Sequence, residues 1–164
     1  MNREYSALAG RIKQTLMDLG KVIQRAEFLM EKSHRNNDDG YLDGVALNLQ
    51  SFYAGIERIF KDIARSIDQT LPTGPDWHQN LLIQMAVEIS STRPPVITQE
   101  TRYGLDEYRA FRHVVHNVYA FNIRPFRLQE LTAGLNKCFQ NLCQDMNNFI
   151  TFLETLDQSE ETES

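Results

Sequence analysis

Residues 41–67 read YLDGVALNLQSFYAGIERIFKDIARSI. Apolar side chains recur in this stretch every three or four positions, which is the period of an amphipathic helix. They are Leu42, Val45, Leu49, Phe52, Ile56, Ile59, Phe60, Ile63 and Ile67. Charged residues fill the positions between them and are expected on the solvent-facing side: Glu57, Arg58, Lys61, Asp62 and Arg65. The stretch therefore predicts a long helix that packs against a core.

Helical periodicity extends to both sides of this stretch. A stripe that begins at Tyr5 predicts a helix over residues 3–33. Beyond the breaker LPTGP, Pro75 and Asp76 open a shorter helix. A long connection is expected over residues 90–104, followed by helices over residues 105–120 and 125–156. No segment alternates as a strand would, so the pattern predicts an all-α fold: an antiparallel helical bundle of four to five helices.

The acidic residues are concentrated at the end of the chain. The net charge is −5, and the stretch from Glu154 onward contains five carboxylates without a lysine or arginine. The remainder is neutral, which argues against a broad basic surface for nucleic acid but allows a local site. We predict a helical domain over residues 1–156 and an acidic, disordered tail over residues 157–164.

The apolar residues do not predict a membrane segment. No run of 18 apolar residues occurs, and the first five residues, MNREY, lack the apolar core of a secretory signal. We therefore expect a cytoplasmic protein that has no contact with a membrane.

Residues 105–119, LDEYRAFRHVVHNVY, combine the side chains that are best suited to chemistry. Steps of 100° per residue place Arg109, Arg112, His116 and Tyr119 within about 80° of one another, with His113 at the edge. The adjacent side is expected to face the core and carries Tyr108, Phe111, Val114, Val115 and Val118. Two guanidiniums, an imidazole and a phenol are thus predicted to share one face.

This group of side chains suits phosphate chemistry without a cofactor. Arginine binds phosphate oxygens through a planar fork of donors, and histidine exchanges a proton near neutral pH. Together they could cleave RNA without a metal, the imidazole assisting attack by the 2′-hydroxyl. A purely structural alternative pairs the arginines with Asp106 or Glu107. The HxxH spacing of His113 and His116 lacks a third ligand, so no metal site is predicted.

Several segments resemble the HepT-like toxins, which are proteins with a HEPN domain. The signature segment is FRHVVHNVY at residues 111–119. Four further segments match in the same order: YLDGVALNL at 41–49, GIERIF at 55–60, WHQNLL at 77–82 and RPPVIT at 93–98. The resemblance covers residues 3 to 155.

The resemblance implies a HEPN-like bundle that forms a homodimer and brings two arginine–histidine motifs to a shared cleft. It also implies a metal-independent endoribonuclease that acts on RNA and is neutralised by a nucleotidyltransferase antitoxin. In some pairs the antitoxin adenylylates the motif tyrosine. By this resemblance Arg112 is the motif arginine, His113 its polar follower and Tyr119 the candidate AMPylation site.

The sequence departs from the family motif at one position. The motif has four residues between arginine and histidine, which places Asn117 where the histidine is expected. His116, one residue earlier, lies close to the direction of Arg112 on a regular helix, whereas Asn117 is turned away. Two interpretations remain: catalysis has moved to His116, or the protein is a weakened or inactive HEPN module that binds nucleotide, RNA or its partner protein.

Overall fold

The computed structural model describes residues 3–119 and 122–163. Its helices are α1 (Arg3–Asn36), α2 (Tyr41–Ile63), α3 (Trp77–Met85), α4 (Gln99–Asn117) and α5 (Pro125–Glu163). A π-helical turn, η1 (Ala64–Asp68), extends α2. Within the described residues the only strand-like pairing is an isolated bridge between Ile89 and Arg93. The prediction of an all-α helical bundle is confirmed.

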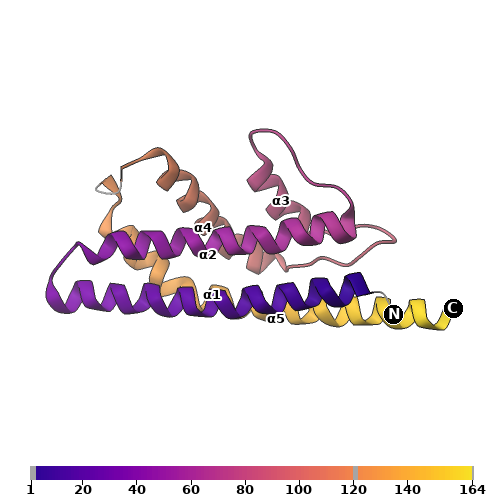
Figure 1. Cartoon of the computed structure of the whole chain (residues 1–164). Helices are drawn as coiled ribbons and strands as arrows, with labels where there is room; N and C mark the ends of the chain where they lie inside the picture. Colours follow the sequence, from indigo (N-terminus) through magenta and orange to yellow (C-terminus); the bar gives the residue numbers. More distant parts are fainter. Residues whose placement is uncertain (1–2, 120–121, 164) are drawn as a thin grey trace.

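The helices form a bundle of three long helices with a shorter pair on one side. In Figure 1, α1 runs antiparallel to α2 and α5, and the two chain ends lie at the same end of the molecule. The shorter α3 and α4 lie on the side of α2 that faces away from α1, and both contact α2. Helix α2 therefore has neighbours on two sides, which buries more of its surface than a simple amphipathic helix buries.

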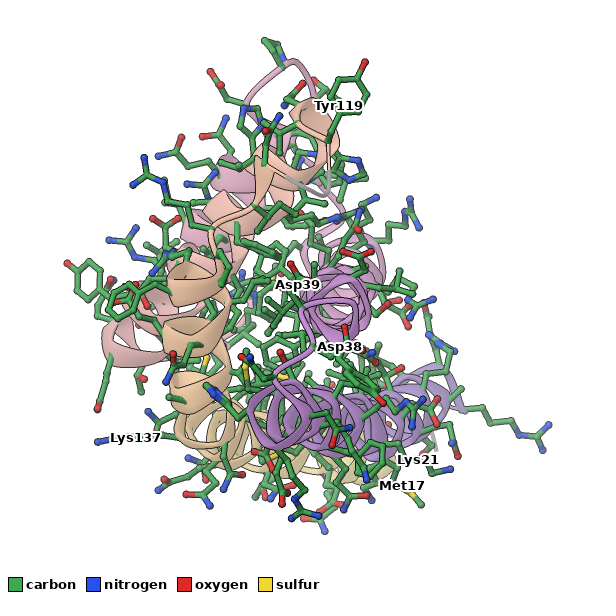
Figure 2. All side chains as sticks on the ribbon, turned by 90° about the vertical axis from the view of Figure 1, so that its left-hand side faces the viewer. Met17, Lys21, Asp38, Asp39, Tyr119 and Lys137 are labelled. Atoms are coloured by element: carbon green, nitrogen blue, oxygen red, sulfur yellow. The ribbon has the colours of Figure 1, made fainter. Side chains whose placement is uncertain are left out.

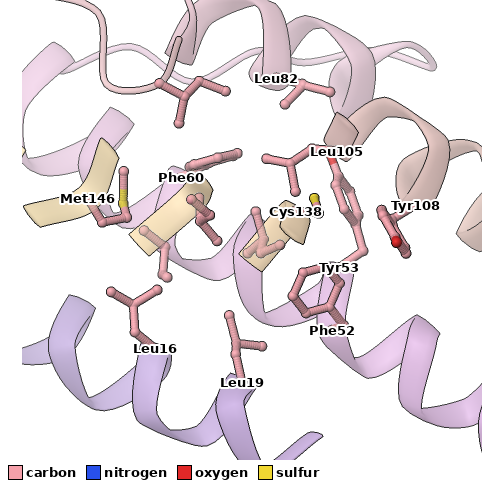
Figure 3. Close-up of a cluster of buried hydrophobic side chains, with 14 of the residues drawn as sticks. Leu16, Leu19, Phe52, Tyr53, Phe60, Leu82, Leu105, Tyr108, Cys138 and Met146 are labelled. Atoms are coloured by element: carbon pink, nitrogen blue, oxygen red, sulfur yellow. The ribbon is translucent and has the colours of Figure 1, made fainter. Parts of the chain in front are cut away.

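The apolar stripes of all five helices meet in one core. Figure 3 shows side chains from α1, α2, α3, α4 and α5 in a single cluster, among them Leu16, Phe60, Leu82, Leu105 and Met146. Burial of such side chains removes apolar area from water, at roughly 25 cal/mol for each Å². This burial is the main favourable contribution to the free energy of folding.

Two glycines allow α1 and α2 to approach closely. A β-carbon at Gly44 would lie 2.7 Å from Leu29 Cδ1, and one at Gly55 would lie 2.7 Å from Leu19 Cδ2. Real β-carbons essentially never approach another atom so closely. The two glycines are eleven positions apart, about three helical turns, so they lie on the same face of α2.

Helix α4 begins earlier than the sequence pattern suggested. Its first residue is Gln99 rather than Leu105, so the connection after α3 is shorter than predicted. The Thr98 hydroxyl accepts a hydrogen bond from the Thr101 backbone N–H, which satisfies a donor at the helix start. Asp145 on α5 in turn accepts from the backbone N–H and the hydroxyl of Thr98. Capping and a tertiary contact together set this boundary.

Arg93, in the connection before α4, is fully buried beside Asp68. Arg93 Nε lies 2.6 Å from Asp68 Oδ1, and neither side chain is exposed. The guanidinium also donates to the backbone carbonyls of Gln84, Val87 and Pro94. A buried ion pair is tolerated when hydrogen bonds satisfy it in this way. The contacts of this pair hold η1, the end of α3 and the connection before α4 in place relative to one another.

The last helix continues beyond the expected end of the domain. Helix α5 reaches Glu163, and Ser6 of α1 donates a hydrogen bond to Asp157 at 3.2 Å. Residues 157–163 are thus helical here, although we expected a disordered tail. The division into a domain over residues 1–156 and an acidic tail over residues 157–164 stays a prediction. None of the helices in the described residues has the length and apolar character needed to span a bilayer.

Candidate active site between helices α2, α3 and α4

A pocket of about 210 Å³ lies where α4 crosses the side of α2 that faces away from α1. Helix α4 contributes half of its polar lining residues, and Tyr53 from α2 and residues around the start of α3 contribute the others. The lining residues are Tyr53, Pro75, Asp76, His78, Gln79, Arg109, Arg112, His113 and His116. Four of the six predicted site residues therefore line one pocket, and Asn117 and Tyr119 are not among the lining residues.

Helix α2 presents a polar stripe to α4. Gln50, Tyr53 and Glu57 are three and four positions apart, so their side chains lie on one face of the helix. Gln50 contacts His116 and Glu57 contacts Arg112. The earlier residue of α2 contacts the later residue of α4, and the later residue of α2 contacts the earlier one. The two helices therefore run antiparallel where they cross.

Arg112 is held by a buried carboxylate. Its Nη1 donates to Glu57 Oε1, and the Glu57 side chain is only 4% exposed whereas that of Arg112 is 24% exposed. The sequence pattern had placed Glu57 on the solvent-facing side of its helix, and that expectation was wrong. The reason is the docking of α3 and α4 on that side of α2, which converts it into an interior surface.

His116 and Asn117 occupy different surroundings. His116 lines the pocket, and its Nε2 lies 3.3 Å from the amide nitrogen of Gln50. Asn117 is exposed and donates its side-chain amide to the backbone carbonyl of His113, 2.8 Å away. The residue at the motif histidine position therefore binds its own helix, while its neighbour faces the pocket.

Arg109 and His113 complete the wall that α4 contributes. Arg109 Nε lies 2.7 Å from Asp106 Oδ1, so this arginine is paired within its own helix. This is the pairing that the structural alternative predicted for Arg109. His113 is exposed at the pocket. Both side chains can still donate to a ligand. The Arg109 guanidinium carries five N–H groups, and the His113 imidazole carries at least one.

Tyr119 lies outside the pocket. We expected a helix through residue 120, but α4 ends at Asn117 and Val118 has the extended backbone angles φ −134° and ψ 156°. The Asn117 side chain bonds the carbonyl of His113 four residues back, a local contact that competes with helix continuation. The helical steps of 100° per residue, which placed Tyr119 on the same face as Arg112, therefore do not apply to Tyr119. Its side chain is 73% exposed and points outward at the edge of the molecule (Figure 2).

The core-facing side of α4 is narrower than expected. Tyr108 and Phe111 are buried as predicted, and Val115 is half-buried. Val114 and Val118 are 49% and 39% exposed, so the expectation that they face the core was wrong. Val114 lines a hollow together with Ile123 and with Arg127 of α5, and Val118 follows the end of α4, so neither valine is enclosed by the packed core.

Two buried donors beside the pocket lack acceptors. The hydroxyl of Tyr53 and Nε of Arg112 have no hydrogen-bond partner among the described residues. Tyr53 is 1% exposed, and burial, with a smaller contribution from Glu57, raises the pKa of its phenol, so it remains a donor. An unsatisfied buried donor costs about 1–3 kcal/mol. Tyr53 and Arg112 both line the pocket, so the two donors border the space that a ligand would occupy.

The sequence-based interpretation missed three residues of this site: Tyr53, Glu57 and His78. His78 Nδ1 lies 2.6 Å from Glu57 Oε2, so one carboxylate contacts both His78 and Arg112. One signal was present in the sequence. The polar positions Gln50, Tyr53, Glu57 and Lys61 follow helical spacing on α2, which indicates a second face with its own partner.

The chemistry of the pocket favours an anionic ligand. It combines two arginines, three histidines and a protonated phenol with one carboxylate, Asp76, so hydrogen-bond donors suited to phosphate oxygens outnumber the acidic groups. Within residues 3–119 and 122–163, no group of three histidine, cysteine or carboxylate side chains is placed to hold a metal ion.

Comparison with known proteins identifies one family. The family model described as "HepT-like protein" matches residues 44–153, which is more than half of the chain. The match includes α3, α4 and most of α2 and α5, and so includes every residue of the pocket. Comparisons with curated proteins and with solved structures found no match.

Proposed function

The chain belongs to the HepT-like family, and we propose that it is a toxin-type endoribonuclease that cleaves RNA without a metal in the pocket between α2, α3 and α4. One observation carries this proposal: Arg112 and His116 line a pocket in which buried donors of Tyr53 and Arg112 lack acceptors. An RNA phosphate offers the oxygens that these donors need. It is also the group on which an arginine and a histidine can act together.

In this proposal the arginines bind the phosphate and His116 transfers a proton. Arg112 and Arg109 bind the phosphate and stabilise the negative charge that develops when the 2′-oxygen attacks it. His116 transfers a proton, because an imidazole changes its protonation state near neutral pH. His113 supports binding at the edge of the pocket. Asn117 contacts its own helix and is given no part in the reaction.

RNA cleavage in excess chelator tests this proposal. The parent protein is expected to cleave structured RNA, and His116→Ala is expected to lower the rate by about 10²–10⁴-fold. Arg112→Ala should lower the rate and weaken RNA binding. His34→Ala, an exposed histidine on α1, is the matched control and should cleave like the parent. Full activity in His116→Ala and Arg112→Ala would contradict the proposal.

We further propose that a nucleotidyltransferase antitoxin neutralises the protein by adenylylating Tyr119. The side chain of Tyr119 is 73% exposed, so another enzyme can reach it. Each added AMP brings bulk and a negative phosphodiester next to the end of α4, which disfavours the approach of RNA.

Transfer of labelled AMP from ATP, by a nucleotidyltransferase encoded beside the gene, tests this second step. Labelling should be lost in Tyr119→Phe, and that variant should stay active in the presence of the antitoxin. Tyr103→Phe is the matched control, since Tyr103 is also exposed, at 65%. Undiminished labelling of Tyr119→Phe would place the modification elsewhere.

A binding module without catalysis is the second candidate. It is favoured by the pairing of Arg112 with Glu57 and by Asn117 at the position of the motif histidine. A protein of this kind would bind RNA, or its partner, without cleaving it. The same experiment separates the two functions, because RNA binding that is sensitive to Arg112→Ala without any cleavage supports the module.

A further inference from the structure

His78 is held in a defined orientation at the wall of the pocket. It is the second residue of α3, and its ring stacks on that of Trp77 with centroids 3.6 Å apart. The ammonium of Lys61 lies 4.1 Å from the centroid of the Trp77 ring. The His78 side chain is 39% exposed, so it remains accessible to a ligand in the pocket.

The buried carboxylate of Glu57 determines which ring nitrogen of His78 can accept a proton. His78 Nδ1 lies 2.6 Å from Glu57 Oε2, and the Glu57 side chain is 4% exposed. A carboxylate accepts hydrogen bonds, so Nδ1 carries the hydrogen and Nε2 of the neutral imidazole has a free lone pair. The same carboxylate stabilises the imidazolium that forms when Nε2 takes up a proton.

Glu57 joins His78 to the arginine of the site. One carboxylate oxygen accepts from Arg112 Nη1 and the other contacts His78 Nδ1. The three residues come from α2, α3 and α4, so this contact forms only when those helices are packed together. Arg112 and His78 are thereby placed on the wall of one pocket together with His116.

We propose that His78 is a second catalytic histidine: the general base of the RNA cleavage, oriented by Glu57 as a positioning residue. This assignment rests on the function proposed above. His78 Nε2 takes the proton of the ribose 2′-hydroxyl as the 2′-oxygen forms its bond to phosphorus. The bond from phosphorus to the 5′-oxygen breaks, and that oxygen takes a proton from protonated His116. The products are a 2′,3′-cyclic phosphate and a 5′-hydroxyl, and exchange with water restores both histidines.

In the neutral ring of His116 the amide nitrogen of Gln50 donates to Nε2, so Nδ1 carries the ring hydrogen. In the protonated ring both nitrogens carry hydrogen, so Gln50 must turn its amide oxygen toward Nε2 when His116 acts as the acid. Charged and titratable groups from every element around the pocket lie near His78, and Glu57 contacts it directly. They are Tyr53, Glu57 and Lys61 on α2, Asp76 before α3, and Arg109, Arg112, His113 and His116 on α4.

Single-turnover cleavage of RNA in excess chelator tests the proposal. His78→Ala and His78→Asn should each lower the cleavage rate by about 10²–10⁴-fold and leave RNA affinity unchanged. The asparagine variant can still donate a hydrogen bond to Glu57, so it separates loss of proton transfer from loss of the contact. His34→Ala again serves as the control. A parental rate in His78→Asn would overturn the assignment.

A substrate with sulfur in place of the bridging 5′-oxygen distinguishes the base from the acid. A thiolate leaves without a proton, so this substrate should restore much of the activity of His116→Ala. It should not restore His78→Ala, which lacks the base. The rise of the rate with pH on the acidic side should also disappear in His78→Ala, because that rise reports loss of a proton from the base.

The outcomes distinguish this proposal from the one on which it rests. A parent protein that does not cleave RNA at all would overturn both. Cleavage that requires Arg112 and His116 but not His78 would overturn the general-base assignment and leave the proposed function standing. Restoration of His78→Ala by the sulfur substrate would make His78 the acid instead, and would also overturn the assignment.

Discussion

His116 and Asn117 are adjacent in the sequence and differ in what their side chains can reach. A helix turns by about 100° between consecutive residues, so only one of the two can face the pocket. His116 faces it, and Asn117 bonds the carbonyl of His113 instead. At the scale of single residues, the histidine that lines the pocket therefore stands one position before the motif position, and the residue at the motif position does not line it.

Restoring the motif histidine should have little effect on cleavage. Asn117→His places an imidazole on an exposed position outside the pocket, so we expect the rate of RNA cleavage to stay within a few-fold of the parent. The combination His116→Asn with Asn117→His should be as inactive as His116→Ala. Single-turnover cleavage rates in chelator measure both, and strong activation by Asn117→His would show that the residue faces the substrate.

Breaking the buried pair of Arg93 and Asp68 should destabilise the fold more than breaking an exposed pair. Arg93→Ala leaves a buried carboxylate without its partner, and we expect it to lower the free energy of unfolding by about 3–5 kcal/mol. Arg35→Ala breaks an exposed pair with Glu31 on α1 and should cost less than about 1 kcal/mol. Urea titrations compare the free energies of unfolding of the two variants, provided that the dependence on urea concentration is the same in both. Equal losses would contradict the role assigned to the buried pair.

At the scale of elements, the close packing of α1 on α2 depends on Gly44 and Gly55. Periodicity in the sequence predicted both helices, but it did not show that two glycines of α2 lie directly against leucines of α1. That contact depends on how the two helices are placed in three dimensions. The same reason explains the error at Glu57, because the pattern assumed one buried face and α2 has two.

Two glycine substitutions should change stability in opposite directions. Gly55→Leu must displace Leu19 and is expected to lower the free energy of unfolding by about 1–3 kcal/mol. Gly10→Ala on α1 meets no atom within 4 Å and should raise it by about 0.5–1 kcal/mol, because alanine favours the helix. Midpoints of urea unfolding measure both changes. A neutral Gly55→Leu would show that α1 and α2 can separate without cost.

At the scale of the whole molecule, buried thiols and phenols should make the fold sensitive to alkali. Burial, with a smaller contribution from Glu107, raises the pKa of Cys138 to about 12 from its ordinary value of 9.0. Burial also raises the pKa of Tyr53 and of Tyr108. The unfolded chain therefore loses these protons at lower pH than the folded chain does. Above pH 9 it binds fewer protons, so the free energy of unfolding must fall as pH rises.

Cys138→Ala should make this fall less steep. The thiol alone accounts for up to about 1.4 kcal/mol per pH unit between its unfolded and folded pKa values. Urea titrations of the parent and the variant at pH 8, 9 and 10, under reducing conditions, measure the two slopes. Identical slopes would mean that the Cys138 thiol ionises as readily in the folded protein as in the unfolded chain.

A homodimer stays a prediction of the family resemblance, and exposed apolar side chains indicate where to test it. Val114 on α4 and Phe126 on α5 are 49% and 70% exposed. Val114→Glu with Phe126→Glu should convert a dimer into a monomer in sedimentation equilibrium. Met17→Glu is the control, since Met17 on α1 is 64% exposed. A parent protein that sediments as a monomer would contradict the dimer.

Sequence alone determined the helical class and the approximate position of each helix. It also determined that Arg112 and His116 lie on one face of a helix. These properties follow from periodicity and from side chains a few positions apart on one helix, so local geometry is sufficient. Only the tertiary structure decided that Glu57 is buried, that it contacts both Arg112 and His78, and that Tyr119 lies apart from the pocket. The contacts of Glu57 join positions up to 55 residues apart, and the end of α4 depends on local hydrogen bonding and on the limit of the packed core. Such contacts arise only when helices meet, because burial and charge pairing depend on which surfaces face each other.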